Sequence, residues 1–189
     1  MRIMMIKLRE LRPEDAPLML EWMHDQDTQK SFKKDMLSTS LEQAIEFCED
    51  AVIPDVIHTG DNLHFAIVDD KDEYLGTISL KNMDLDSLTA EYAITTRKKA
   101  RGKGVGFTAT GILLKKAFKE YGLHRVYLNV FSDNAAAIKM YERCGFHFEG
   151  EFRDHIKRDG EYVNWKWFGM LENEFDEQIF ARRLCPKIS

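Results

Sequence analysis

The sequence predicts an α+β fold with a central mixed sheet, mostly antiparallel, flanked by helices. Three observations predict it: strand-like segments in the middle of the chain are joined by short polar turns, a strand–helix–strand run follows them, and two long strand-like segments meet at Asp159-Gly160. A chain of 189 residues is near the usual size of one domain. We therefore expect a single domain over residues 1–189, with its core at about residues 5–172.

The N-terminal part predicts one short strand and two helices. The strand covers about residues 5–9, and Pro13, which suits a first helical turn, opens the first helix. The second helix covers about residues 40–51. Opposite its apolar stripe lies a row of acidic residues: Glu42, Glu46, Glu49 and Asp50. This row is either a solvated helix face or a field that attracts an amine substrate.

The middle of the chain predicts three strands, at residues 64–68, 74–80 and 90–94. The turns between them are polar and short, which predicts antiparallel pairing. A helix then follows a glycine-rich loop and ends near Gly122, and residues 125–130 form a buried strand. Strand, helix and strand make a βαβ unit, so the sheet must be parallel at this point. We expect Gly111, in the middle of this helix, to allow close packing on the sheet.

The C-terminal part predicts a helix and a long hairpin. Asn134 belongs to a favourable helix start, and Gly145 ends that helix. Residues 146–156 and 162–171 then read as two strands joined by a tight turn. We expect the two tryptophans of the second strand, Trp165 and Trp167, to lie in the core. Residues 174–189 form a charged tail, partly helical, with no assigned role.

Composition excludes several classes of protein. A net charge of −5 argues against a nucleic-acid partner, and no apolar run is long enough to cross a bilayer. Without a signal peptide, a cytoplasmic protein with no membrane partner is expected. Cys48, Cys144 and Cys185 are too far apart in the sequence for a metal pair, so we expect reduced thiols. The six histidines lack metal-site spacing, and no metal is expected.

The loop at residues 101–106, Arg-Gly-Lys-Gly-Val-Gly, is suited to binding phosphate. Its glycines let backbone N–H groups approach an anion at a helix N-terminus. The pattern lacks the lysine and hydroxyl order of a Walker A loop. Residues 104–109 do match G-x-G-x-x-A, and Asp133 ends the next strand, as in a dinucleotide-binding loop. However, residues 95–100 separate this loop from its strand, and the repeated βαβ units of that fold are missing.

Two motifs together resemble those of another family. Arg101-x-x-Gly104-x-Gly106 resembles the pyrophosphate loop of the GNAT superfamily of acetyl-CoA-dependent N-acetyltransferases. The segment at residues 134–146, from Asn134 through Tyr141 to Gly-Phe, is similar to a second motif of that family. The resemblance covers about residues 6–171 and, at both ends, is closest to the RimJ/RimL-like branch, which includes spermidine N-acetyltransferases. It implies a GNAT-like fold whose βαβ unit binds acyl-CoA.

The resemblance implies acetyl-CoA as the acetyl donor and assigns residues to it. The backbone near residues 94–96 would pair with pantetheine, and the loop amides would hold the pyrophosphate. The basic run at residues 97–99 either attracts the other CoA phosphate or is solvated surface. The expected donor-binding residues are Ile94, Thr95, Thr96, Arg101, Gly102, Lys103, Gly104, Val105, Gly106, Phe107, Asn134 and Ala137.

Two residues are candidates for the chemistry. By resemblance, Tyr141 protonates the departing thiolate, although a core tyrosine is the alternative. Glu91, on the strand before the loop, is a candidate base or amine anchor, although it is equally suited to a solvated surface. Strand alternation puts Glu91, Ala93 and Thr95 on one side of the sheet and leaves open which side faces the acceptor.

The acceptor is expected to be a small cationic amine, such as a polyamine, attacked directly in a ternary complex. An amino sugar, a protein N-terminal amine and a non-catalytic acyl-CoA sensor remain alternatives. A homodimer is common among the enzymes that the chain resembles. By location alone, the candidate acceptor residues are Trp22, Phe32, Asp35, Phe47 and Tyr162.

Overall fold

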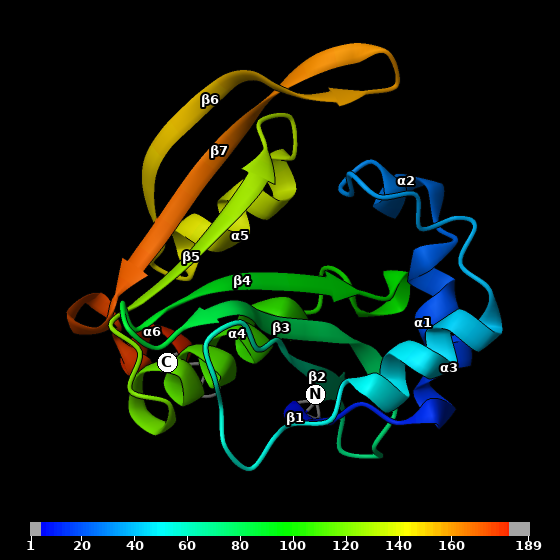
Figure 1. Ribbon diagram of the computed structural model, residues 1–189, viewed down its shortest axis with the longest axis horizontal. Coiled ribbons are helices and arrows are strands. Elements are labelled where there is room, and N and C mark those ends of the chain that lie inside the picture. Colours follow the sequence, from blue (N-terminus) through cyan, green and yellow to red (C-terminus); the bar gives the residue numbers. More distant parts are fainter. Residues whose placement is uncertain (1–4, 182–189) are drawn as a thin grey trace, which may run out of the picture.

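A seven-stranded sheet forms the centre of the computed structural model, which describes residues 5–181 (Figure 1). The strand order is β1-β2-β3-β4-β5-β7-β6. Only β4 and β5 run parallel, and the other neighbours are antiparallel. This confirms the predicted fold class and excludes a doubly wound sheet in this part of the chain. The strands are β1 Lys7–Glu10, β2 Leu63–Val68, β3 Tyr74–Asp84, β4 Thr89–Thr96, β5 Arg125–Phe131, β6 His147–Arg158 and β7 Glu161–Leu171.

Local capping chemistry sets the helix boundaries. Pro13 opens a 3-10 turn that leads into the first helix. The Ser40 side chain accepts the Gln43 N–H in a capping box that starts the third. A π-helical turn, Lys116–Glu120, extends the fourth. The helices are α1 Ala16–Met23, α2 Gln26–Gln29, α3 Leu41–Asp50, α4 Val105–Lys115, α5 Ala135–Arg143 and α6 Glu177–Ala181. None of those within residues 5–181 is long and apolar enough to span a bilayer.

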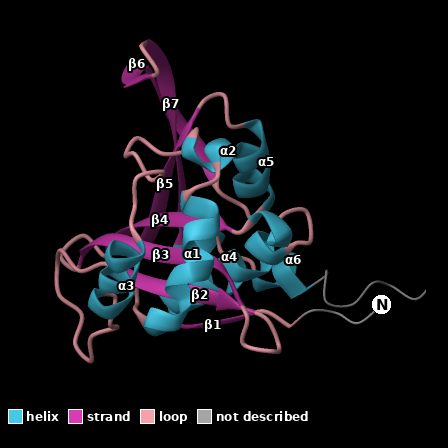
Figure 2. Cartoon of the chain, turned by 90° about the vertical axis from the view of Figure 1, so that its right-hand side faces the viewer, coloured by secondary structure: helices cyan, strands magenta, loops and turns pink. Residues whose placement is uncertain are grey.

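The sheet separates two hydrophobic clusters. On one face, Met19 and Trp22 of α1 and Ala44 of α3 pack against Ala66 and Tyr74. On the other face, α4 and α5 contribute to a larger cluster with the alternate strand residues. Figure 2 shows α1 and α3 in front of the sheet and α4 behind it. Side chains alternate along each strand, so His64, two residues before Ala66, faces the α1/α3 side. Thr77, the cross-strand partner of Ala66, faces the same side.

The parallel pair β4–β5 is short, and the two strands then separate. Residues 89–91 of β4 pair with residues 125–127 of β5, with Glu91 opposite Tyr127 at the end of the pairing. Beyond that point β4 continues to Thr96 and β5 to Phe131 without pairing to each other. In Figure 1, β5 and the β6–β7 hairpin arch away from β4. The unpaired edge of β4 therefore offers backbone groups to a ligand.

The C-terminal helix α6 packs on α4, which corrects the expectation for Gly111. A Cβ on Gly111 would lie 2.4 Å from the Phe180 ring, so this glycine admits α6 and does not serve packing on the sheet. Phe180 also contacts Phe107, with ring centroids 4.9 Å apart. The predicted helix in the tail is confirmed at Glu177–Ala181, and it has a packing role. Residues 182–189, with Cys185, lie outside the described residues.

The expected core placement of Trp165 and Trp167 is wrong. Both are only partly buried, whereas the alternate residue Phe168 is 1% exposed. They stack with neighbouring aromatic rings, among them Tyr127 and Phe131. The alternation of side chains along the strand correctly places both tryptophans on one face of the hairpin, but it does not show which face is buried.

Candidate active site

The glycine loop has the backbone shape of an anion site. Gly102 (φ 72°) and Gly104 (φ 81°) are in the left-handed region, where other residues are strained. Gly104 is the N-cap of α4, and no side chain caps that helix. The first backbone N–H groups of α4 therefore point into the loop without a capping oxygen. These residues fit the pyrophosphate of a CoA donor.

Gly106 strengthens that fit. Its φ is not positive, and a Cβ there would meet only the Ile94 Cδ1 atom, at an ordinary contact distance of 3.6 Å. Neither backbone conformation nor packing within the protein therefore requires glycine at this position. A close approach of a ligand to the start of α4 is the physical reason that remains.

The cations around the loop are mostly engaged by the protein itself. The Arg97 side chain is 5% exposed, and its guanidinium binds Glu21, Glu73 and the Tyr74 carbonyl oxygen. Lys99 also pairs with Glu73. The solvated-surface interpretation is therefore wrong for the buried Arg97, whereas Lys99 is an exposed residue that forms an ion pair. Their local sequence looks like a basic loop, but their partners are distant in the chain.

Arg101 and Asn134 both contact the segment around α2. The Arg101 guanidinium lies 3.2 Å from Asp25 and also donates to Thr28. Asn134 is the N-cap of α5, where its Oδ1 accepts the Ala137 N–H at 3.2 Å, and its amide nitrogen donates to the Ser31 hydroxyl at 3.1 Å. The predicted helix start is confirmed. The segment around α2 thus connects the glycine loop with the start of α5.

Tyr141 is buried beside the same split. Its ring packs edge-on against Tyr92, with centroids 5.9 Å apart, and against Phe146. Among the described residues its hydroxyl has no hydrogen-bond partner, and burial raises the pKa of the phenol above its ordinary value. A phenol that stays protonated at neutral pH can donate a proton. Sequence reasoning missed Tyr92, whose hydroxyl is 2.6 Å from that of Thr110 on α4.

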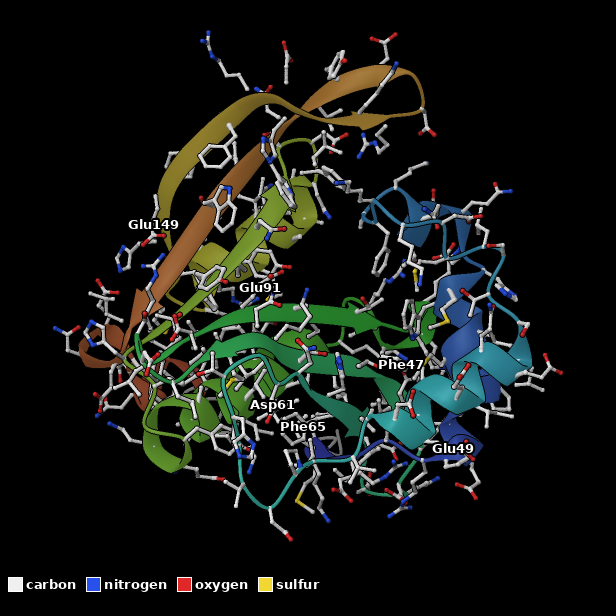
Figure 3. All side chains as sticks on the ribbon, viewed as in Figure 1. Phe47, Glu49, Asp61, Phe65, Glu91 and Glu149 are labelled. Carbon is white, nitrogen blue, oxygen red and sulfur yellow. The ribbon has the colours of Figure 1, made fainter. Side chains whose placement is uncertain are left out.

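Glu91 lies where β4 and β5 begin to separate, as Figure 3 shows. Its carboxylate is bound by three side chains: Lys81 Nζ at 2.9 Å, Asn82 Nδ2 at 2.8 Å and Asn129 Nδ2 at 3.4 Å. Its side chain is 17% exposed. The residue therefore occupies the α1/α3 face, and its oxygens are already engaged.

A cavity of about 570 Å³ extends over the α1/α3 face of the sheet and decides which side of β4 is open. Ala93 and Thr95 line it, so the side of Glu91 is the accessible one. Its floor is formed by His64, Thr77, Ser79, Lys81, Ala93, Ile94 and Thr95. Its walls and rim come from Trp22, Met23, Phe32, Lys34, Asp35, Met36, Ser38, Thr39, Gln43, Glu46, Phe47 and Asp50.

Four of the five residues expected to meet the acceptor lie together in this cavity. Trp22 and Phe32 stack with centroids 5.7 Å apart, and Asp35 and Phe47 lie beside them. Tyr162 is not among them, because it lies on the hairpin with 63% exposure. Of the acidic row on α3, Glu46 and Asp50 line the cavity, whereas Glu42 and Glu49 do not.

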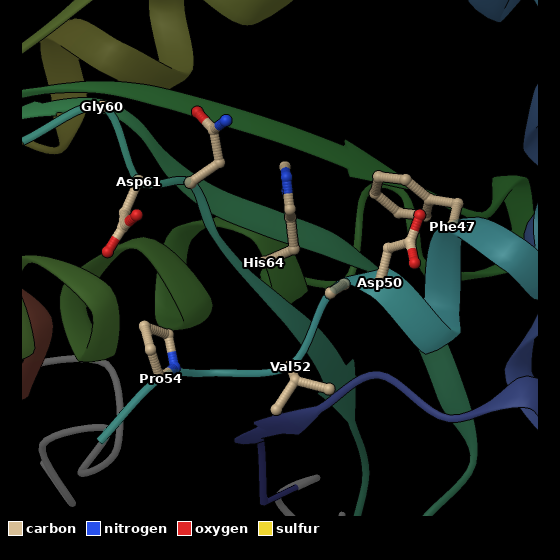
Figure 4. Close-up of a pocket in the computed structure, with 9 residues that line it drawn as sticks. Phe47, Asp50, Val52, Pro54, Gly60, Asp61 and His64 are labelled. Carbon is tan, nitrogen blue, oxygen red and sulfur yellow. The ribbon is translucent and has the colours of Figure 1, made fainter. Parts of the chain in front are cut away.

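A second, more open hollow of about 470 Å³ adjoins the cavity (Figure 4). The two share Phe47, Asp50 and His64. His64 Nδ1 lies 2.7 Å from the Ser79 hydroxyl, and burial, with the nearby Lys81 charge, lowers the pKa of the imidazole. Sequence reasoning missed this pair. The available signal was that each of two adjacent antiparallel strands carries a polar residue on the same face, where the two can contact each other.

Within residues 5–181, no group of three or more His, Cys, Asp or Glu side chains is arranged to hold a metal ion. Cys48 and Cys144 are free and buried. Burial raises the pKa of Cys48 to about 11 and that of Cys144 to about 12, so neither is an activated thiol.

Comparison with known proteins agrees with this geometry. Residues 6–147 match the family described as the acetyltransferase (GNAT) domain. The spermidine N(1)-acetyltransferase of Vibrio cholerae is 28% identical over 119 residues, which cover 63% of this chain and 69% of that protein. Its counterpart in Escherichia coli K12 is 27% identical over 159 residues, 84% of this chain and 82% of that protein.

Solved structures show the same fold. The spermidine N-acetyltransferase from Vibrio cholerae, crystallised with CoA and spermine, superposes with a TM-score of 0.78 at 23% identity. The alignment covers 89% of this chain and 96% of that one. With the family match spanning most of the chain and the β4–β5 split, glycine loop and α5 tyrosine in place, the protein is a member of the GNAT family of acetyl-CoA-dependent N-acetyltransferases.

Proposed function

We propose that the protein acetylates a primary amine of a small polycationic acceptor of the polyamine type. The observation that carries the proposal is the cavity on the α1/α3 face, whose aromatic walls stand beside the carboxylates of Asp35, Glu46 and Asp50. Of the two lysines there, Lys81 is already paired with Glu91. Carboxylates attract ammonium groups, and aromatic faces bind cations and cover methylene chains. Relatives named spermidine N(1)-acetyltransferase support the same acceptor class.

The donor site follows from the loop. The N–H groups at the start of α4 hold the pyrophosphate of acetyl-CoA, with the positive end of the helix dipole behind them. The unpaired edge of β4 at residues 94–96 hydrogen-bonds the pantetheine arm and polarises the thioester carbonyl. Asn134 and Ala137 contact the donor from α5. The donor and the cavity thus meet at β4.

The transfer takes place in a ternary complex. The neutral amine attacks the thioester carbon, and the tetrahedral intermediate then expels the CoA thiolate. Tyr141 gives its proton to that sulfur, since burial raises the pKa of the phenol and keeps it protonated at neutral pH. Glu91, bound by Lys81 and Asn82, does not line the cavity, and its charge acts on the amine only from beside it.

Release of free thiol from acetyl-CoA on an amine panel tests the proposal. The panel contains spermidine, spermine and putrescine, an aminoglycoside, free amino acids, and peptides with a free N-terminus. We expect the largest kcat/KM with a polyamine. A preference for an aminoglycoside or a peptide would contradict the proposed acceptor class. Tight binding of acetyl-CoA in calorimetry, with no turnover on any amine, would indicate a sensor.

Matched variants on α3 locate the acceptor. Glu46→Gln removes a carboxylate of the cavity, whereas Glu42→Gln removes one outside it, one helical turn away. Because an exposed charge pair contributes up to about 1 kcal/mol, Glu46→Gln raises the KM for a polyamine by about five-fold. Glu42→Gln leaves the KM unchanged. Equal effects of both variants would mean that only the long-range field of the helix matters.

A further inference from the structure

We propose that Ser79 and His64 form a proton relay that takes the proton released by the acceptor amine and passes it to solvent. This rests on the cavity proposed above as the acceptor site. Ser79 receives the proton, directly or through one water, and hands its own hydroxyl proton to His64. Ser79 would then be a catalytic residue, with His64 as its partner. Together they would take the role of base for which the sequence made Glu91 a candidate.

Strand register places the relay beside the reacting groups. Ser79 on β3 pairs with Ala93 on β4, and His64 on β2 pairs with Ser79. All three side chains line the cavity. Ala93 is small, so no large side chain stands between the Ser79 hydroxyl and the edge of β4 where the thioester binds. An amine over β4 is therefore within reach of Ser79 by a direct hydrogen bond or one water.

The hydrogen bond within the pair is short and fixed. The Ser79 hydroxyl lies 2.7 Å from His64 Nδ1, and the edge of the Phe47 ring meets the imidazole at 5.0 Å between centroids. Ser79 is 5% exposed, so its orientation is constrained on the cavity floor. His64 also lines the open hollow of Figure 4, which gives the proton an exit.

Glu91 is less suited to the same task. Each of its carboxylate oxygens already accepts a hydrogen bond at under 3 Å, one from the Lys81 ammonium and one from the Asn82 amide. Proton transfer to this carboxylate would break a charge-assisted pair. The pair has a second effect, because it holds the Lys81 charge near His64.

The charges around His64 favour its neutral form. Lys81 on β3 and burial both lower the pKa of the imidazole. Glu46 and Asp50 of α3 and Asp61 of the following loop oppose this from the cavity rim and the hollow, and they are more solvated. The imidazole is therefore uncharged at neutral pH, and its Nδ1 accepts a proton from Ser79.

Each proton is accounted for. The bound ammonium loses one N–H proton to the Ser79 oxygen while the Ser79 O–H proton moves to His64 Nδ1, which leaves a neutral amine, an intact serine and an imidazolium. The amine forms the new C–N bond, and the C–S bond breaks. Tyr141 protonates the thiolate, the second amine proton neutralises the tyrosinate through solvent, and the imidazolium loses its Nε2 proton to the hollow.

The test compares pH profiles of kcat for His64→Gln, Ser79→Ala and the double variant, using whichever amine the wild-type protein acetylates. Each single variant lowers kcat at pH 7 by about 10²-fold, the lower end for general acid–base catalysis. The double variant loses no more than either single one, because the two residues act as a unit. The KM for acetyl-CoA stays unchanged, and His58→Gln, an exposed histidine, serves as the control.

The profile separates a relay from a structural role. The wild-type kcat decreases at acidic pH, with a midpoint below the ordinary pKa of histidine. This decrease disappears in His64→Gln but persists in Glu91→Gln. Wild-type kcat in both single variants, or losses that multiply in the double variant, would overturn the relay. Activity on an amine other than a polyamine would overturn only the acceptor class, since the profile can still be measured with that amine.

Discussion

Replacing Tyr141 with phenylalanine removes one oxygen from the proposed donor site and leaves the packing of the ring in place. The ring contacts with Tyr92 and Phe146 do not use the hydroxyl, and among residues 5–181 that hydroxyl has no hydrogen-bond partner. A hydrogen bond contributes a net stabilisation of about 1 kcal/mol. Because the substitution breaks no hydrogen bond within the described residues, it should change the free energy of unfolding by less than about 1 kcal/mol. The fold should be unaffected by Tyr141→Phe.

Turnover should respond strongly. If the phenol protonates the thiolate, its loss lowers kcat by about 10²-fold, equivalent to about 2.7 kcal/mol of transition-state stabilisation. The KM for acetyl-CoA should stay the same, because the pyrophosphate and pantetheine contacts lie elsewhere. Thiol release measures kcat, calorimetry measures acetyl-CoA affinity, and urea denaturation measures stability. Unchanged turnover in a folded variant would refute the assignment, and a large loss of stability would show that the hydroxyl is structural.

The remaining predictions concern the loop and two buried contacts. Gly106→Ala should raise the unfolding free energy by up to about 1 kcal/mol, because a helical site favours alanine, yet weaken acetyl-CoA binding about ten-fold in calorimetry. Gly104→Ala should instead cost about 1–2 kcal/mol in urea denaturation, because φ is 81° there; equal stability of the two variants would contradict the backbone argument. Arg97→Ala should lower the unfolding free energy by about 1–3 kcal/mol, since it leaves the Glu21 carboxylate and the buried Tyr74 carbonyl without their donor, while Glu73 keeps Lys99. Unchanged stability together with a loss of acetyl-CoA affinity would instead place Arg97 in the donor site. Gly111→Ala should destabilise the wild-type chain, because the new Cβ meets the Phe180 ring. In a Phe180→Ala background the same substitution should stabilise the protein by about 1 kcal/mol, and thermal denaturation would show this reversal.

Local signals predicted much of the architecture. Short polar turns require antiparallel neighbours, and a strand–helix–strand run requires a parallel pair, so the mixed sheet followed from connection lengths. The start of α5 followed from Asn134, whose side chain caps the next turn, and the position of α3 followed from its apolar stripe. Each of these features depends on contacts within a few residues, which a linear pattern records.

Predictions that needed distant partners were the ones that failed. Arg97 reads as part of a basic loop, but its carboxylate partners lie 24 and 76 residues away in the sequence. Gly111 was assigned to packing on the sheet because nothing in its own helix points to Phe180. Trp165 and Trp167 were placed in the core because alternation gives two faces without stating which one is covered.

The sequence by itself determined the local geometry on which the proposed donor site depends. A glycine loop before α4 and Asn134 at the start of α5 specify two helix starts, because both depend on local backbone geometry. Only the tertiary structure decided the acceptor side. The packing of α1 and α3 on one face of the sheet made that face of β4 the floor of a cavity, bound the Glu91 carboxylate to Lys81, and brought His64 to Ser79. Strand periodicity places side chains on alternate faces, but long-range helix packing decides which face meets the substrate.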